Sequence, residues 1–497
     1  MEVYESARPL CAMLVSLSAV LLIGLSGRWP NLRETWTLMA AVLKFAIVLS
    51  MLPIVLGGKV IECFIVHVLP GLDLALRVDP LGMTFALTAS FLWIITSCYS
   101  IGYMRSLAEH AQTRYFMCFA VALCAALGIA FSANLFTLFV FYELLTLCTY
   151  PLVVHKQTPE AIFGGRKYLV YLLGTSIFFQ LPAIFLVYYY TGTLEFSSQG
   201  ILAGKAPEIA VIITYILFIA GITKAAVMPL HAWLPAAMVA PTPVSALLHA
   251  VAVVKAGVFT VVRVLLYVFG VDLLEEIGLG VILAYVASFT IIAASVIAMM
   301  QDDLKLRLAY STVSQLSYIV LAVGLLTPSA IASSIIHITM HAFGKITLFF
   351  TAGAIYVATY KTRISELDGI GRQMPFTMMA FTLGTLSMIG MPLFGGFVSK
   401  WYLAMGAIEA GRLPILIVLA ASSILNACYL LPIVYAAFFK EPKAGGQVIA
   451  PKIKEAPAFM VVPVVLTGIE AMALFFWPSL ILDLAKMIVG YVTGESY

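Results

Sequence analysis

The sequence predicts an all-α polytopic membrane protein, and two observations carry that prediction. Hydrophobic residues make up 62% of the 497 residues and charged residues only 10%, a balance that excludes a soluble or a disordered chain. The apolar runs suit spanning helices of about 20 residues. They lack the alternating pattern of outer-membrane barrel strands. The chain is therefore expected to cross a bilayer many times as helices.

Clusters of charge, proline and glycine divide the chain into fourteen candidate spans. These cover residues 10–27, 36–56, 79–103, 114–131, 134–154, 167–190, 208–230, 241–269, 277–300, 308–326, 330–358, 375–408, 413–438 and 458–490. Sixteen lysines and arginines flank the loops that follow odd-numbered spans, against five on the other face. The positive-inside rule then places the first face in the cytoplasm and both termini outside.

Seven cations fall inside the spans, where a charge is costly and usually functional. Arg263 and Lys486 lie near span ends, and we expect both to extend toward the membrane surface. The other five are Lys44, Lys224, Lys255, Lys345 and Lys400.

The fifth and seventh spans carry one buried charge each. Glu143 sits halfway along the fifth span and needs a partner, either in a structural ion pair or at a site that gains and loses a proton. Lys224 lies one turn before Pro229, which removes a helix hydrogen bond and breaks the seventh helix. A break at membrane depth is tolerated only beside protein or a water-filled cavity, so hydration beside Lys224 is expected.

The eighth and eleventh spans carry histidines. His249 and Lys255 lie six residues apart and face different neighbours, so one can serve as a relay while the other is structural. His337, His341 and Lys345 recur every four residues, which stacks them on one helix face about 6 Å apart. Because imidazole exchanges protons near neutral pH, this row indicates a proton wire completed by water. The alternative is a polar seam that only packs.

The twelfth span is too long for one straight helix, and Pro392 supplies a second break. Lys400 follows that break at membrane depth. Both breaks contain the tripeptide Met-Pro-Leu, and paired interrupted segments indicate an inverted-repeat architecture.

The stretches GITKAAVMPLHAWLP, FVFYELL, QDDLKLRLAYSTVSQLSY, HITMHAFGK and GMPLFGGFVSK resemble motifs of a known family. These are the antiporter-like membrane subunits shared by respiratory complex I, Mrp-type sodium/proton antiporters and energy-converting hydrogenases. The resemblance runs from about Asp79 to Phe439. It implies fourteen helices with two inverted five-helix repeats, each with one broken helix. The implied division is 1–110 (first three helices), 111–270 and 271–440 (repeats), and 441–497 (last helix).

The resemblance also implies roles. Glu143 is the acid and Lys224 its paired lysine, and Lys255 connects the halves. His337, His341 and Lys345 form the central axis, and Lys400 is the exit residue. Lys400 and the short region after the last span favour a chain similar to the D-type protein of Mrp antiporters or to its hydrogenase counterpart.

The implied function is translocation of protons, with sodium exchange left open, inside a multisubunit complex of a prokaryotic cytoplasmic membrane. The expected partners are other membrane subunits and the lipid bilayer, without nucleic acid. Which complex, and in which direction transport is coupled, stays open at this point.

Two other function classes have to be considered. A stand-alone secondary transporter of a small solute would also use broken helices, but these breaks offer mainly Lys, Gly, Pro and His. A redox enzyme is disfavoured because the seven cysteines are scattered without cluster spacing and no GxGxxG fingerprint follows a strand. We therefore expect no cofactor or metal in this chain. Lys44 and Glu470 have no assigned role.

Overall fold

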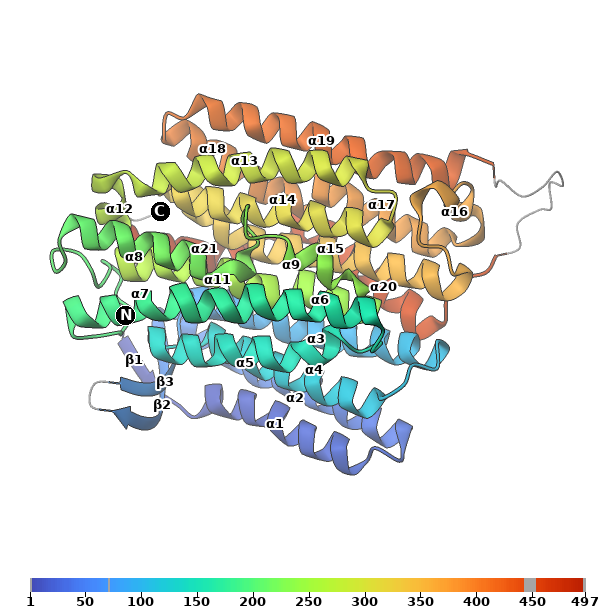
Figure 1. The fold of residues 1–497 in the computed structure, drawn as a ribbon, viewed down its shortest axis with the longest axis horizontal. Helices are drawn as coiled ribbons and strands as arrows, with labels where there is room; N and C mark the ends of the chain where they lie inside the picture. Colours follow the sequence, from blue (N-terminus) through green and yellow to red (C-terminus); the bar gives the residue numbers. More distant parts are fainter. Residues whose placement is uncertain (1, 70–71, 442–452, 495–497) are drawn as a thin grey trace.

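The computed structural model describes residues 2–69, 72–441 and 453–494. Within them, twelve helices are long and apolar enough to cross a membrane. Two shorter apolar helices, Glu208–Gly221 and Pro375–Ile389, belong to the two spans that were predicted to be broken. Together these helices account for the fourteen predicted spans. They run roughly parallel through the molecule (Figure 1).

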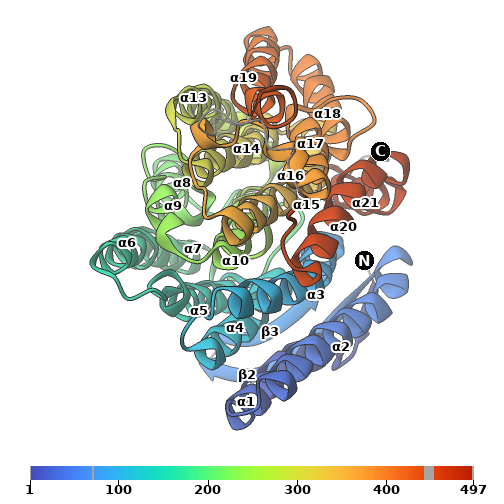
Figure 2. The ribbon, with the colours of Figure 1, turned by 90° about the vertical axis from the view of Figure 1, so that its right-hand side faces the viewer.

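The first three helices differ in how deeply they lie. In the first two helices only 33% of the apolar 18-residue stretch is buried inside the molecule, against 78% in the third. Figure 2 shows the first two as a pair at the edge of the bundle, with the third between them and the centre. They are α1 (Arg8–Leu25), α2 (Pro30–Leu56) and α3 (Pro80–Ser106).

A small β-sheet joins the second and third helices, which the all-α expectation did not include. The strand β2 (Lys59–Leu69) pairs in parallel with β1 (Glu2–Glu5) and antiparallel with β3 (Leu72–Val78). The segment VIECFIVHVL is rich in β-branched residues, a composition that favours strands. The sheet and the last helix lie toward the same end of the bundle (Figure 1), as an even number of spans requires.

The next four spans surround one side of the centre. The sixth is one continuous helix, Pro159–Thr191, with two π-helical turns inside it. The elements are α4 (Gln112–Ala130), α5 (Leu135–Val153), α6 (Pro159–Leu169), η1 (Val170–Gly174), η2 (Ser176–Gln180), α7 (Leu181–Thr191) and α8 (Glu208–Gly221).

The seventh helix is broken, as predicted, but the break begins earlier than Pro229. Regular helix stops at Gly221, before Lys224, and only short turns follow. A Cβ on Gly221 would lie 2.4 Å from the backbone nitrogen of Gln180, so glycine permits close packing where the helix ends. The turns are η3 (Thr223–Ala225), α9 (Trp233–Ala236) and η4 (Ala237–Val239).

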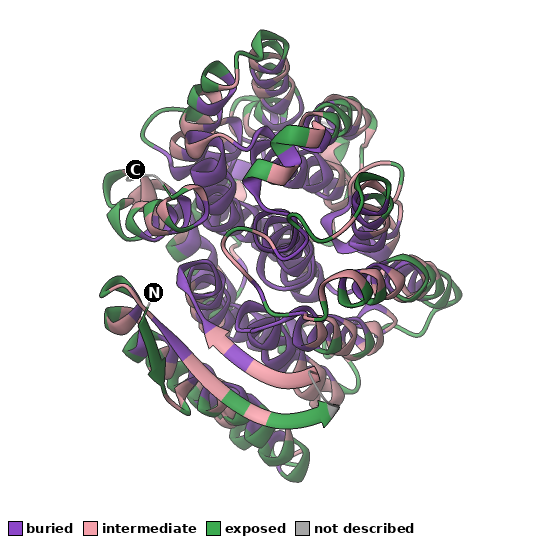
Figure 3. Ribbon diagram, turned by 90° about the vertical axis from the view of Figure 1, so that its left-hand side faces the viewer, coloured by how far each residue is buried: buried purple, intermediate pink, exposed green. Residues whose placement is uncertain are grey.

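The eighth span, Thr242–Phe269, lies at the centre of the bundle. Its apolar 18-residue stretch is completely buried inside the molecule. Figure 3 shows the central helices buried and the outer helices exposed on their outward faces. This span comprises α10 (Thr242–Ala246), η5 (Leu247–Val251), α11 (Val253–Val264) and η6 (Leu265–Phe269), and α12 (Val271–Ile277) follows it.

The second group of helices contains the second predicted break. The helix α17 ends at Ile389 and α18 begins at Gly395, so the break at Pro392 is present. The elements are α13 (Leu279–Met300), α14 (Leu304–Leu325), α15 (Pro328–Thr359), η7 (Ile364–Glu366), α16 (Ile370–Gln373), α17 (Pro375–Ile389), α18 (Gly395–Glu409) and α19 (Leu413–Phe439).

The last predicted span is two helices rather than one. The chain bends at Trp477 and Pro478, between α20 (Ala458–Phe476) and α21 (Ser479–Thr493). The single span 458–490 was wrong because Pro478 cannot continue the hydrogen bonding of α20. The α21 segment packs against α15 and α3, as α20 does. Lys443 and Lys452, two of the sixteen lysines and arginines counted on the face predicted to be cytoplasmic, lie outside the described residues.

Candidate functional site

Glu143, the first of the predicted proton-translocating residues along the chain, lies on α5 beside the first helix break. Its residue is half-buried, and neither carboxylate oxygen makes a hydrogen bond within the described part of the chain. Ser176 and Lys224 are polar groups close enough to act on it electrostatically. The carboxylate is thus held in a polar niche without a fixed partner.

Lys224, in η3, is completely buried and points at the same helix. Its Nζ donates hydrogen bonds to the Tyr142 carbonyl at 3.0 Å and to the Thr146 hydroxyl at 2.7 Å. No salt bridge joins it to Glu143 in the described residues, so the expected direct pair is not formed. The reason is helical geometry: Tyr142 and Thr146 share a face of α5, and Glu143 is turned about 100° from it.

The helix α11 approaches this break very closely. A Cβ on Gly257 would lie 2.2 Å from the carbonyl carbon of Lys224, so only glycine fits there. Lys255, two residues earlier, is fully buried. The glycine therefore brings the first break next to the helix that carries the second lysine.

Lys255 connects the central span to the histidine row. Its Nζ lies 2.6 Å from Nδ1 of His341 on α15, and both side chains have no exposed surface. The two residues come from the two predicted repeats. Lys255 and His341 thus form one polar contact across the middle of the molecule.

The histidine row lies along α15 as its spacing predicts. The rings of His337 and His341 have centroids 5.7 Å apart. Nδ1 of His337 lies 2.7 Å from the hydroxyl oxygen of Ser399 on α18. Because α18 follows the second break, this contact ties the row to the broken helix.

Lys345 turns toward α14. Its Nζ donates to the Leu308 carbonyl at 3.2 Å and to the Ser311 hydroxyl. His249, in η5, packs against Phe349 with ring centroids 4.6 Å apart, and neither of its ring nitrogens has a hydrogen-bond partner in the described chain. It lies close enough to His341 and Lys345 to interact with both electrostatically. His249 thus belongs to the central cluster rather than to the lipid surface.

Lys400 lies at the second break. Its Nζ donates to the carbonyls of Met388 and Ile389, each at 2.9 Å. These carbonyls end α17, where the helix dipole favours a cation. The Tyr318 ring centroid lies 5.0 Å from the same nitrogen.

The predicted residues therefore lie on a series of elements, each of which contacts the next across the bundle. The break η3 contacts α11, α11 contacts α15, and α15 contacts α18. The closest links are Lys255 to His341, His341 to His337, and His337 through Ser399 toward Lys400. We call this set, from Glu143 through Lys224, Lys255, His341 and His337 to Lys400, the polar axis. His249 and Lys345 flank it.

Two cations differ from what the sequence predicts. Arg263 is 2% exposed and forms a two-pronged ion pair with Asp79, with Nη2 to Oδ1 at 2.9 Å. The expectation that it reaches the membrane surface is wrong, because Asp79 caps α3 at the same depth. Lys305, counted as a loop cation, donates to the Met238 and Ala240 carbonyls at 2.8 and 2.6 Å. The position of Lys305 in the stretch QDDLK, which belongs to one of the motifs quoted for the resemblance, was the sequence feature that could have indicated this role.

Of three further ionisable residues, one matches its expected exposure and two still have no assigned role. Lys486 is exposed, as expected. Lys44 is fully buried, donates to the Leu123 carbonyl at 3.0 Å and lies 4.8 Å from the Trp93 ring centroid. Glu470 is half-buried with one carboxylate oxygen lacking a partner in the described residues.

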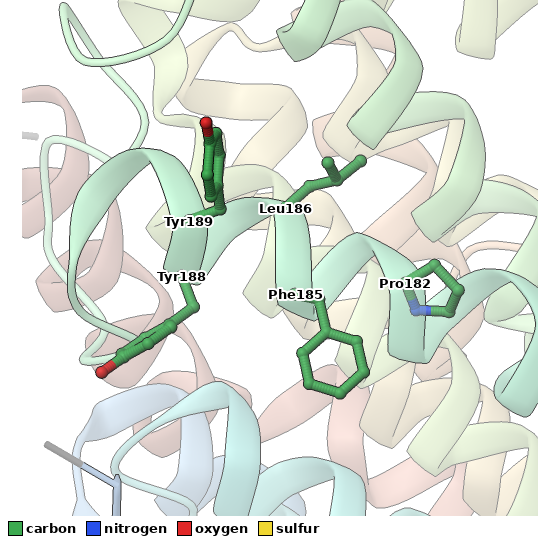
Figure 4. Close-up of a pocket in the computed structure, with 5 residues that line it drawn as sticks. All are labelled: Pro182, Phe185, Leu186, Tyr188 and Tyr189. Atoms are coloured by element: carbon green, nitrogen blue, oxygen red, sulfur yellow. The ribbon is translucent and has the colours of Figure 1, made fainter. Parts of the chain in front are cut away.

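The pocket drawn in Figure 4 lies on α7, away from the polar axis. It is lined by Pro182, Phe185, Leu186, Tyr188 and Tyr189. The Phe185 and Tyr189 side chains are largely exposed, as expected of a surface that meets lipid. None of the polar-axis residues lines this pocket.

Comparison with known proteins identifies the family of this chain. Residues 132–426 match the family described as NADH:quinone oxidoreductase/Mrp antiporter, TM. The chain is 33% identical over 422 residues to NADH-quinone oxidoreductase subunit N of Desulforudis audaxviator, covering 82% of each chain. It is 33% identical over 351 residues to the chloroplastic NAD(P)H-quinone oxidoreductase subunit 5 of Zygnema circumcarinatum, covering 66% of this chain and 48% of that protein. The chain thus spans about half the length of that relative.

Two solved structures share the fold. A chain of the Mrp complex from a Dietzia species superposes with a TM-score of 0.88 at 22% identity, covering 99% of this chain and 98% of that one. A chain of the membrane-bound sulfane sulfur reductase, an archaeal respiratory membrane complex, gives 0.87 at 24% identity and covers 98% of both. The chain therefore belongs to the NADH:quinone oxidoreductase/Mrp antiporter transmembrane family, that of the antiporter-like, proton-translocating subunits of membrane complexes.

Proposed function

We propose that protons cross this chain along the polar axis, from Glu143 through Lys224 and Lys255 to the histidine row and out at Lys400. The observation that carries the proposal is the 2.6 Å contact between Lys255 and His341. It gives the two halves of the chain a direct contact between two fully buried titratable side chains. An ionisable residue inside a membrane is functional by default, and the polar axis is a series of such residues on elements that contact one another.

The chemistry requires groups that change charge in turn. A buried lysine is stabilised as the neutral amine by desolvation and as the ammonium by a nearby anion. In a medium of low dielectric constant, moving one proton therefore changes the proton affinity of the next group strongly. The hydroxyls of Thr146, Ser311 and Ser399 offer donors and acceptors between stations. Water completes the remaining gaps.

The two helix breaks support the proposal because they supply free backbone groups at membrane depth. Lys400 already uses two carbonyls at the second break. Such irregular backbone is tolerated where it lines a cavity, and it marks ion sites in transporters built from inverted repeats. We assign residues 111–270 and 271–440 to two such repeats, flanked by 1–110 and 441–497.

The same proposal places the chain inside a multisubunit complex of a prokaryotic cytoplasmic membrane, with both termini outside. The excess of lysine and arginine on one face supports this orientation. Similarity to chains of an Mrp complex and of an archaeal respiratory complex supports other membrane subunits as partners. Any redox chemistry then belongs to the partner subunits. Exchange of sodium for protons is the alternative to transport of protons alone.

The test uses the complex purified with this chain and reconstituted in liposomes that enclose a pH-sensitive dye. We expect Lys255→Met to reduce proton flux at least tenfold, because methionine keeps the length of the side chain without its charge. The matched control is Lys486→Met, since Lys486 is an exposed lysine in a helix. Flux that survives Lys255→Met at the level of the control would refute the route.

A further inference from the structure

Three metal-ligating side chains gather outside the polar axis, on a loop face of the bundle. Glu109 and His110 lie between α3 and α4, and His155 follows α5. Their possible ligand atoms all lie within 4.8 Å of one another. Nε2 of His155 is 3.7 Å from Oε2 of Glu109, and the two imidazole rings have centroids 4.7 Å apart. Two chain segments distant in sequence thus present one set of ligands.

His155 is the unusual member of this cluster. Its side chain is 0% exposed, and neither ring nitrogen has a hydrogen-bond partner in the described residues. A buried polar group without a partner is costly, so such a group calls for an explanation. The Tyr115 ring packs edge-on against the imidazole, with centroids 5.9 Å apart, and limits its movement. His155 is therefore held in place with unused nitrogen atoms.

The backbone of the loop holds the other two ligands beside His155. Ala108 and Ala111 both have positive φ, 47° and 48°, and they bracket Glu109 and His110. The amide of Glu109 donates to the Met104 carbonyl at 3.0 Å. The Glu109 carbonyl accepts a bond of 3.1 Å from the Gln112 side chain. These contacts turn the loop tightly and fix where its side chains start.

We propose that Glu109, His110 and His155 bind a divalent transition-metal cation of the zinc class. Zinc takes imidazole nitrogen and carboxylate oxygen as ligands, and in a tetrahedral site these atoms lie about 3.3 Å apart. The contact of 3.7 Å needs only a small adjustment. His110 is exposed and can rotate to close the site. A water molecule fills the fourth position.

The charges around the cluster decide which cation fits. Arg114 and Lys156 lie near His155 and oppose a cation, whereas Glu109 attracts it. Two imidazole nitrogens with one carboxylate favour zinc over magnesium, which prefers oxygen ligands and keeps its waters.

Metal at this position would fasten the α3–α4 loop to the end of α5. The helix α5 also carries Glu143, about 15 Å along its axis from the helix end at Val153. Binding would thus restrain the helix that presents the first station. The metal site itself does not depend on the proton route, because its three residues stand apart from the polar axis.

The experiment measures zinc binding to the full-length chain in lipid nanodiscs by isothermal titration calorimetry, after treatment with a chelator. We expect one saturable zinc ion per chain in the wild type. His155→Gln and His110→Gln should each weaken binding at least tenfold. The matched control is His67→Gln, because His67 is an exposed histidine that pairs with Asp73 at 2.6 Å in the β-sheet.

Folding of each variant is checked by size-exclusion chromatography and by its thermal midpoint before titration. His110 is exposed, so His110→Gln keeps the test decisive even if His155→Gln fails to fold. Magnesium at millimolar concentration should not displace zinc. Absence of saturable zinc binding in the wild type, or equal binding by His110→Gln and the wild type, would overturn the site.

Discussion

Lys255 Nζ and His341 Nδ1 lie 2.6 Å apart and join α11 to α15 in the fully buried centre of the bundle. Near them lie His249 and Lys345, one on each of the same two spans. The contact places a lysine within proton-transfer distance of an imidazole. The most informative mutations therefore begin with this pair.

Replacing Lys255 by Met and His341 by Ala should give effects on proton flux that are not additive. Both side chains serve the same step, so the double variant should lose less than the sum of the two single losses, each expressed as a free energy. The measurement is flux through the reconstituted complex for the two single variants and the double variant. Additive losses would mean that the two groups act independently.

Glu143→Gln should abolish proton flux and leave assembly nearly intact. The isosteric amide keeps the volume of the side chain, and the carboxylate oxygens it replaces have no hydrogen-bond partner in the described chain, so the packing of α5 should be kept. The amide cannot, however, take up and release a proton at neutral pH. Flux and subunit content of the purified complex are compared with those of Glu143→Asp, which keeps the charge and should retain partial flux. Normal flux in Glu143→Gln would remove this residue from the route.

The Arg263–Asp79 pair should matter for stability rather than for transport. Asp79→Ala leaves a buried guanidinium without its counter-ion and should cost about 3–5 kcal/mol. Arg263→Lys should also destabilise, because an ammonium cannot hold both carboxylate oxygens in the same planar geometry. Thermal unfolding of the full chain in detergent measures both, with Lys486→Arg as the neutral control. Unchanged midpoints would contradict the pair's structural role.

Ser399→Ala should slow transport less than loss of a histidine does, because it removes only the hydroxyl that meets Nδ1 of His337 at 2.7 Å. Water can occupy the vacated space and restore part of the link. Combining Ser399→Ala with His337→Ala should add little to His337→Ala alone. A combined loss equal to the sum of both would place Ser399 on a separate route. Flux through the reconstituted complex again serves as the measurement.

Much of the fold follows from simple sequence rules. Apolar runs located the spans because a bilayer demands about 20 apolar residues for each crossing. The proline rule located both broken helices, although Gly221 ends the first one earlier than Pro229 would. Four-residue spacing correctly placed His337 and His341 on one face of α15. Each of these features depends on local chemistry that a single segment contains.

Features that depend on contacts between distant segments do not follow from such rules. Because Arg263 lies near the end of its span, the sequence predicts that its side chain is accessible. Its burial depends instead on the ion pair with Asp79 at the start of another helix. The resemblance implies a Glu143–Lys224 pair, but Tyr142 and Thr146 present the acceptors on the side of α5 that faces Lys224. The pairing of β1 with β2 does not follow from local rules, because these strands lie more than fifty residues apart and pair in parallel. The antiparallel pairing of β2 with β3 was missed although the β-branched composition of β2 is a local signal.

The most direct test of the polar axis is net proton translocation by the reconstituted complex that carries Lys400→Ala. Lys400 ends the axis and is bonded to the carbonyls of Met388 and Ile389, so alanine removes the last charge that can switch. We predict loss of net translocation, with Lys486→Ala behaving like the wild type. Wild-type translocation by an intact complex with Lys400→Ala would contradict the account.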